Sequence, residues 1–242
     1  MPCQSRLKVT RHARILEYPV YRALTHLAID GIVFIEDLVG PSRGVSLRTA
    51  LTGVRYLTLN QLTVCAFTFR DARVLDIFFQ SIRSMSKLKR ITLGHFALPD
   101  PNHPPRLPAC LANSPIPIKA LNIHHTHGEA LSFLFECFEP ENLLLESCWF
   151  IRHLPDCDEL TLSRIQTFDK FFNVLLGWDG RKLTIDSCPF LDEMFVKRLR
   201  GVMIDAEKAV WPGVNIFFHG YGYEVWRRIE EFQDLRWRLE MQ

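Results

Sequence analysis

Two eight-residue stretches of this chain are nearly the same, and their repetition narrows the folds that the sequence can adopt. They read LLLESCWF at 143–150 and LTIDSCPF at 183–190. In both, one residue separates two apolar residues, an acid follows directly, and a cysteine comes three positions after the second apolar residue. Because successive side chains of a β-strand point to opposite faces, each apolar pair lies on one face of a strand. The stretches therefore predict two strands that end in the same kind of turn.

The spaced apolar pair recurs along most of the sequence, with a third residue three positions further on. The copies are Leu27/Ile29 with Ile32, Leu57/Leu59 with Leu62, Ile91/Leu93 with Phe96, Leu121/Ile123 with Thr126, Leu143/Leu145 with Cys148, Leu160/Leu162 with Ile165, and Leu183/Ile185 with Cys188. Weaker copies at the two ends are Leu7/Val9 and Ile216/Phe218 with Tyr221. Successive main copies lie 17 residues apart from Leu143 to Leu160 and 34 residues apart from Leu57 to Ile91. Self-similarity on this scale predicts stacked units, each with one short strand and a return segment of variable length.

Most of the segments between the copies have apolar residues at helical spacing. The predicted helices span 71–85, 128–138, 167–178 and 191–203. The segment 98–118 differs, because its prolines favour an extended excursion over a long helix. Near the end of the chain, 223–242 carries one apolar stripe and is otherwise charged, as expected of a terminal cap. We therefore expect an α/β fold in a single irregular domain over 1–242, with about 8–9 strand units and a capping helix at 222–242.

The pattern L-x-x-L-x-L-x-x-C followed by a helix resembles leucine-rich repeats of the cysteine-containing kind found in F-box proteins. The stretches LKRITLGHFALP, IKALNIHH and RKLTIDSCPFLDEMFVKRL resemble the leucine-rich region of fungal F-box-like proteins. The resemblance covers roughly residues 20–220. It implies a leucine-rich-repeat solenoid, with a curved parallel sheet and helices on the convex side. It also implies a non-enzymatic protein-protein interaction module that is similar to the substrate-recognition region of an F-box protein.

The sequence departs from that family at its start. The family usually opens with an F-box, whose helices begin with an LP-x-E motif and bind a Skp-type adaptor of a ubiquitin ligase. Residues 1–20 are too few to form one, and the strand copies begin by Leu27. The chain is therefore expected to be a fragment or a relative that does not recruit a ligase. A Skp-type adaptor is expected as a partner only if an F-box lies outside this chain.

Composition and charge limit the compartment and the partners. The 242 residues are 48% hydrophobic with a formal net charge of +2, which lacks the basic excess typical of nucleic-acid binding. No apolar run is long enough to span a bilayer, and charges interrupt the first residues where a signal peptide would have its apolar core. Seven cysteines without an export signal favour reduced thiols. We expect an intracellular protein, cytoplasmic or nuclear, with no membrane or nucleic-acid partner.

The binding surface predicted from this pattern is the strand face opposite the apolar pairs. Its side chains are polar, mixed in charge and different in each copy, which suits ligand capture on an extended surface. Aromatic and arginine side chains are frequent binding anchors. The expected binding residues are Tyr56, Arg90, Asn122, His124, Glu146, Glu159, Lys182 and Asp186. No catalytic residue, metal or cofactor is expected. Cys148 and Cys188 occupy the slot of apolar residues in other copies and are interpreted as small buried hydrophobes.

Two alternative functions use other residues. One is a metal-dependent or other enzyme built on His124, His125 and His127, although neither these residues nor Cys148, His153 and Cys157 have the close cysteine pairs of structural zinc sites. The other is a nucleic-acid binder acting through arginines interleaved with tryptophans in the last helix, at Arg227, Arg228, Arg236 and Arg238. Acids are nearly as frequent in that helix, which favours a solvated surface.

Overall fold

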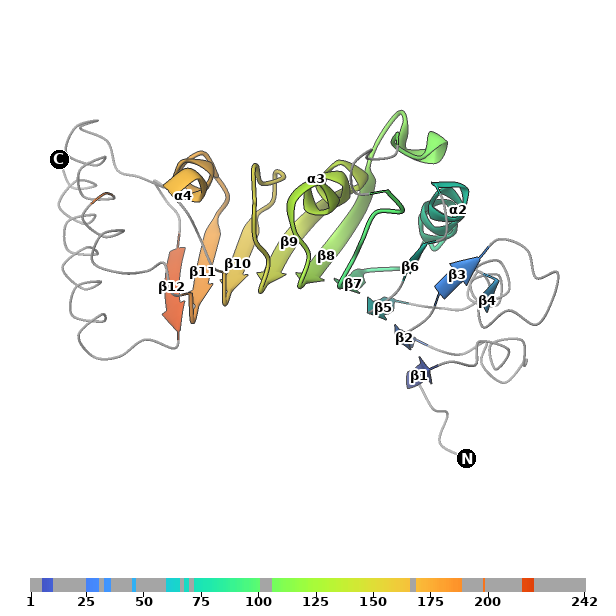
Figure 1. Ribbon diagram of the computed structural model, residues 1–242. Helices are drawn as coiled ribbons and strands as arrows, with labels where there is room; N and C mark the ends of the chain where they lie inside the picture. Colours follow the sequence, from blue (N-terminus) through green and yellow to red (C-terminus); the bar gives the residue numbers. More distant parts are fainter. Residues whose placement is uncertain are drawn as a thin grey trace.

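The central feature of the computed structural model is a nine-stranded sheet (Figure 1). The structure describes residues 6–10, 25–30, 33–35, 45–46, 60–65, 68–69, 72–100, 106–165, 169–188, 198 and 215–219. Every neighbouring pair of strands in this sheet is parallel. The strands are β1 (Arg6–Thr10), β2 (His26–Asp30), β5 (Gln61–Cys65), β7 (Arg90–Gly94), β8 (Ile116–His124), β9 (Phe138–Glu146), β10 (Glu159–Ser163), β11 (Lys182–Asp186) and β12 (Asn215–His219).

Strand order in the sheet equals strand order in the chain. The register aligns one apolar pair from each strand across the whole sheet, and in every strand except β5 this is the predicted pair. The first members of the pairs form one row, which is Leu7, Leu27, Leu62, Ile91, Leu121, Leu143, Leu160, Leu183 and Ile216. From Leu62 to Leu183 each of them is at most 1% exposed. The period-two pattern therefore predicted the strands and their buried side, and the expectation of a parallel α/β architecture is confirmed.

One predicted strand lies at a different position. The pair Leu57/Leu59 was expected to form the inward face, but β5 begins at Gln61 and buries Leu62 and Val64. The two pairs are five residues apart, and period-two alternation fits both equally well. Pairing with β2 and β7 selects the later pair, because Leu62 aligns with Leu27 and Ile91. Residues 51–59 lie outside the described residues.

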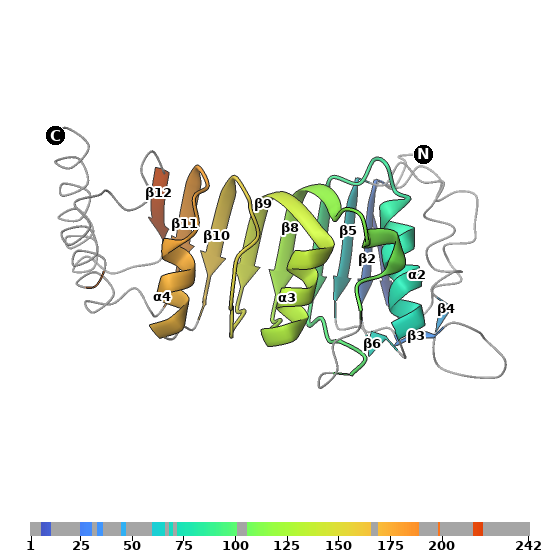
Figure 2. The ribbon, with the colours of Figure 1, turned by 90° about the horizontal axis from the view of Figure 1, so that it is seen from above.

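Three helices lie on one side of the sheet, where the views of Figures 1 and 2 agree. They are α2 (Ala72–Arg83), α3 (Gly128–Cys137) and α4 (Asp169–Leu176), and they confirm three of the predicted helices. Of the fourth, 191–203, only Arg198 is described, and the predicted cap at 222–242 lies outside the described residues. In Figure 1 the strands follow an arc, and the helices lie on its outer side.

The strands β8 and β9 extend beyond the predicted copies. The excursion expected over 98–118 ends earlier, because β8 begins at Ile116 after the short 3-10 helix η4 (Ala109–Leu111). Ile116 pairs with Phe138, and both are buried. The register then skips Lys119, so that the buried alternation changes phase before Leu121. A second, three-stranded parallel sheet contains β3 (Val33–Ile35), β4 (Val45–Ser46) and β6 (Thr68–Phe69).

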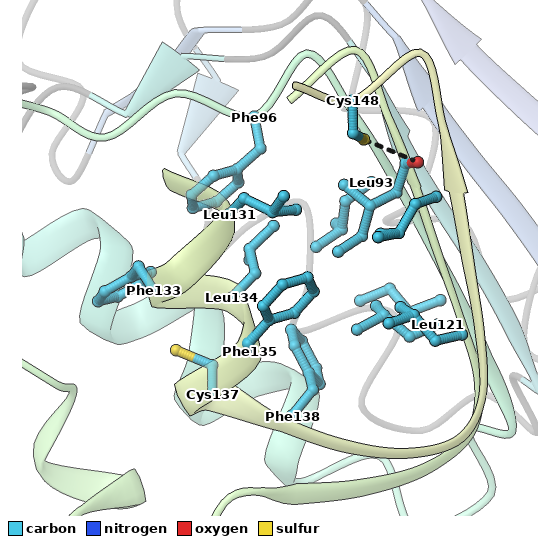
Figure 3. Packing of buried hydrophobic residues seen from close by; sticks show 14 of the residues in the cluster. Leu93, Phe96, Leu121, Leu131, Phe133, Leu134, Phe135, Cys137, Phe138 and Cys148 are labelled. Atoms are coloured by element: carbon cyan, nitrogen blue, oxygen red, sulfur yellow. Dashed lines mark hydrogen bonds between the residues drawn. The ribbon is translucent and has the colours of Figure 1, made fainter. Parts of the chain in front are cut away.

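The core fills the space between the sheet and the helices (Figure 3). Phe79 of α2 is fully buried, with its ring 5.7 Å from the rings of Phe133 and Phe138. Phe133 comes from α3 and Phe138 begins β9, so aromatic contacts join two helices to a strand. Burying a side chain of this size contributes about 1.5–3 kcal/mol. This packing covers one face of the sheet and leaves the other for contacts outside the core.

Candidate functional site: the open face of the sheet

We call the sheet face opposite α2, α3 and α4 the open face. In the described strands from β5 to β11 its side chains alternate with the buried ones, and most are partly exposed. The central row holds Thr63, Thr92, Asn122, Leu144, Thr161 and Thr184. Because adjacent strands lie about 4.8 Å apart, these side chains form a closely spaced row. The open face is thus polar along most of its length, with Leu144 as an apolar interruption.

A chain of charged contacts crosses the open face at the carboxyl ends of β8 and β9. Nδ1 of His124 lies 2.6 Å from Oε2 of Glu146, and Nη1 of Arg164 lies 3.2 Å from Oε1 of the same carboxylate. An ionised carboxylate only accepts hydrogen bonds, so Nδ1 of His124 is the donor in this contact. Glu146 therefore holds two donors with its two oxygens. The structure brings His124 and Glu146 together as two predicted binding residues and adds Arg164, which the sequence prediction missed.

Three further predicted residues of the open face, Asn122, Glu159 and Lys182, have partners on neighbouring strands. Nδ2 of Asn122 donates to Oγ1 of Thr92 at 3.4 Å. Nζ of Lys182 lies 3.8 Å from Oε2 of Glu159 on the adjacent strand. Exposed pairs of this kind contribute about 0.2–1 kcal/mol, so their main effect is to orient the side chains.

The end of β11 carries an oriented carboxylate. Asp186 accepts from Oγ of Ser163 at 3.2 Å and from Oγ of Ser187 at 2.9 Å. Arg90 is exposed at the start of β7. The predicted anchor Tyr56 lies outside the described residues, and Gln61 occupies the register position expected for it.

Each strand from β7 to β11 is followed directly by a residue with left-handed backbone. His95, His125, Ser147, Arg164 and Ser187 have φ between 49° and 52°. Their amides continue the ladder between strands, as when His95 N–H donates to the carbonyl of His124 at 2.9 Å. This conformation is uncommon outside glycine and is imposed here by the shared turn. Arg164 could have been predicted from its position in the sequence, because it directly follows a strand copy, as His125 does.

The third residue of each copy lies just inside this turn. The hydroxyl of Thr126 accepts from Phe96 N–H at 3.2 Å and donates to the carbonyl of His124 at 3.1 Å. The thiol of Cys188 accepts from Ile165 N–H at 3.4 Å in the same way. The third position of a copy is therefore occupied either by an apolar side chain or by a side chain that hydrogen-bonds the neighbouring turn. The predicted structural role for Cys148 and Cys188 is extended by this capping function.

The thiols of this slot are unsuited to nucleophilic chemistry. Cys148 is 0% exposed and Cys188 is 1% exposed. Burial raises the pKa of the Cys148 thiol to about 11 and the pKa of the Cys188 thiol to about 11, against an ordinary value of 9.0. Because the thiolate is the reactive form, a raised pKa lowers reactivity at neutral pH.

The histidines proposed for a metal site have separate neighbours. His124 faces Glu146, the ring of His125 stacks on that of His95 at 4.7 Å, and the ring of His127 lies 5.1 Å from that of Trp149. Within the described ranges no group of three histidine, cysteine or acidic side chains could hold a metal ion. The arginines of the nucleic-acid alternative lie outside those ranges.

Comparison with known proteins adds no relative to this description. No protein-family model, curated protein or solved structure matches the chain. Among the helices of the described residues, none is both long and apolar enough to cross a bilayer. What the open face offers chemically is a row of oriented hydrogen-bond donors and acceptors.

Proposed function

We propose that this protein is a leucine-rich-repeat solenoid that binds another protein through the open face. The observation that carries the proposal is a parallel sheet in chain order whose described helices all lie on one side. The other face carries side chains that differ from strand to strand and are already oriented by cross-strand contacts. Oriented side chains lose less conformational freedom on binding, which favours affinity.

The recurring turn supports the solenoid part of the proposal. The parallel register repeats over nine strands, and from β5 to β11 each strand buries one apolar pair. The third position is filled by a buried apolar or hydrogen-bonding side chain, as at Phe96, Thr126 and Cys188. Such units bury their apolar faces only against their neighbours, and extended sheet surfaces of this kind serve as binding surfaces.

An F-box-like role is the finer part of the proposal, carried by the resemblance of the sequence stretches. In that role the open face selects a substrate protein, and a ligase adaptor would require an F-box outside this chain. The thiols of Cys110, Cys137, Cys148 and Cys157 form no disulfide, which supports the proposed reducing, intracellular setting.

Capture from a lysate with quantitative mass spectrometry tests the proposal. The bait is the full chain, compared with an open-face variant that combines Thr161→Arg and Thr184→Arg on adjacent strands. The matched control places the same substitutions on exposed helix positions, as Gln80→Arg and Asn173→Arg. Any protein lost with the first variant is then purified and titrated calorimetrically against all three chains.

A partner that binds the wild type and the helix-side control, but not the open-face variant, is the expected result. Skp-type adaptor and cullin among the captured proteins would favour the ligase role, and their absence would favour a stand-alone adaptor. If every captured protein binds the open-face variant as well as the wild type, the open face is not the binding surface and the proposal fails.

A further inference from the structure

Arg83 and Ser114 form an exposed contact between the end of a helix and a loop. Nη1 of Arg83 donates to the carbonyl oxygen of Ser114 at 2.8 Å, and Nη2 donates to its Oγ at 2.9 Å. Arg83 is the last residue of α2, and Ser114 lies between η4 and β8. Both residues are exposed, so solvent reaches the place where the hydroxyl and the guanidinium meet.

The loop is anchored on both sides of this contact. The short helix η4 contacts α2, and Leu111 at its end is buried. On the other side Ile116 begins β8 and is buried as well. Ser114 is therefore an exposed residue at a defined place between two buried ones.

The guanidinium of Arg83 has no acidic partner in the part of the chain that the structure describes. Both of its hydrogen bonds end on Ser114, which is neutral. By contrast, Arg152, Arg164 and Arg181 all contact carboxylates. A guanidinium carries five N–H donors in a planar fork that matches phosphate oxygens in pairs. An anion at Oγ of Ser114 would therefore meet a full, unpaired positive charge.

The hydroxyl of Ser114 has a different partner from those of other exposed or partly buried serines. Ser81 donates to a helix carbonyl at 2.8 Å, and Ser187 donates to the carboxylate of Asp186 at 2.9 Å. A phosphate on either of these hydroxyls would meet an oxygen that repels it. On Ser114 it would instead meet the guanidinium that already contacts Oγ.

The sequence at this position has a second distinguishing feature. Pro115 follows Ser114, and no other serine or threonine of the 242 residues precedes a proline. A residue before proline favours extended backbone, and Ser114 lies outside the helices and strands. Proline-directed protein kinases act on a serine that directly precedes proline in an exposed segment. Ser114 combines that neighbour with exposure and an oriented arginine.

We propose that Ser114 is phosphorylated by a proline-directed kinase and that the phosphate pairs with Arg83, joining the loop 106–115 to α2 more tightly. In the transfer, Oγ of Ser114 bonds to the γ-phosphorus of ATP, and the bond from that phosphorus to the bridging oxygen breaks. ADP leaves, and the hydroxyl proton passes to the base of the kinase. The inference needs the proposed intracellular setting, where ATP is present, but it does not depend on the open face.

Two negative groups near Arg83 oppose the pairing, and both are weaker than the guanidinium. The carboxyl end of a helix carries about half a negative charge, but here Ser84 N–H already donates to the carbonyl of Gln80 at 3.1 Å. Asp76 lies two turns earlier on α2, about 10 Å along the helix axis and thus about one Debye length away. The guanidinium carries a full charge within hydrogen-bond distance of Oγ, so we expect net attraction.

Incubation of the full chain with a purified proline-directed kinase and ATP, followed by peptide mass spectrometry, tests the site. We expect phosphate on Ser114 and none on Ser86, an exposed serine that is followed by lysine. Pro115→Ala should lower the rate of phosphorylation at Ser114 by about tenfold or more. Absence of phosphate on Ser114, or an equal rate in Pro115→Ala, would overturn the inference.

Phosphoserine incorporated at 114 during translation tests the pairing with Arg83 separately. The second pKa of phosphoserine is about 6, and a neighbouring guanidinium lowers it. Phosphorus NMR should therefore give a lower pKa in the wild-type background than in Arg83→Gln, with Arg152→Gln as the matched control. The phosphate should also raise the melting temperature by about 2–4 °C, and this rise should disappear in Arg83→Gln.

Each outcome decides one part of the inference. An equal phosphate pKa with and without Arg83 overturns the pairing. A melting temperature that does not rise, or that rises equally in Arg83→Gln, overturns the tighter joining of the loop to α2. None of these measurements uses the open face, so their failure would not count against the proposed function.

Discussion

Three glycines in the described core region give a graded test of how closely this backbone packs. A Cβ on Gly180 would lie 2.4 Å from the carbonyl oxygen of Cys157 and 2.1 Å from Cζ2 of Trp178. The carbonyl belongs to the backbone and cannot rotate away. Trp178 would have to leave a site where it is 5% exposed and donates to Sγ of Cys157 at 3.3 Å. We expect Gly180→Ala to cost about 3 kcal/mol, at the upper end of ordinary overpacking.

Gly94 meets a different obstacle. Its Cβ would lie 2.7 Å from Sγ of Cys65, the register partner on the neighbouring strand. A thiol can rotate, so we expect Gly94→Ala to cost about 1–2 kcal/mol. Cys65→Ala removes the sulfur, and the double variant should recover most of this loss. Gly177 is the control, because its nearest atom would lie at 3.6 Å, an ordinary contact.

Thermal unfolding followed by circular dichroism measures the series. For a chain of this length each kcal/mol moves the melting temperature by about 2–4 °C, so Gly180→Ala should melt about 6–12 °C below the wild type. Gly177→Ala should melt near the wild type. Equal melting temperatures for all three single variants would refute the close approaches on which the ranking depends. Additive losses for Gly94→Ala and Cys65→Ala would refute the specific contact between strands.

Further predictions concern the turns and the charged contacts. Thr126→Val leaves the buried Phe96 N–H without its acceptor and should cost about 1–3 kcal/mol in urea unfolding. Thr126→Cys should cost clearly less, because the thiol of Cys188 accepts from Ile165 N–H in the same way; equal costs would contradict the capping role. A thiol with raised folded pKa keeps its proton longer than the unfolded chain, so stability should be complete below pH 9.0 and fall toward pH 11. The fall should be smaller when threonine replaces Cys148 and Cys188, and a fall of the same size would contradict this origin. A double-mutant cycle of His124→Ala and Glu146→Ala should give a coupling of about 0.2–1 kcal/mol, and zero coupling would mean that the pair does not form in solution.

The strands could be predicted because each apolar pair that a strand buries can be recognised within a short stretch of the sequence. Leu160 and Leu162 alternate with polar neighbours, and no competing pair lies nearby. At Leu57 to Val64 two pairs compete, and only the alignment of Leu62 with Leu27 and Ile91 decides between them. Register is a property of neighbouring strands, so local alternation could not supply it.

The candidate site was predictable to a similar extent. The side of the sheet on which a side chain lies follows from the alternation of side chains along the strand. His124 and Glu146 were therefore expected on the side opposite the apolar pairs, where they lie. Their contact at 2.6 Å requires knowing that β8 and β9 are neighbours.

Strand order in the sheet has a mechanical consequence. Each strand of the nine-stranded sheet pairs only with the strands of that sheet that come before and after it in the chain, so a force applied to the two ends should peel strands away from the edges one at a time. The released lengths would be unequal. They range from 17 residues between Leu143 and Leu160 to 35 between Leu27 and Leu62, or about 60 to 120 Å of extended chain. Pulling would thus read out the spacing of the copies as a series of uneven steps.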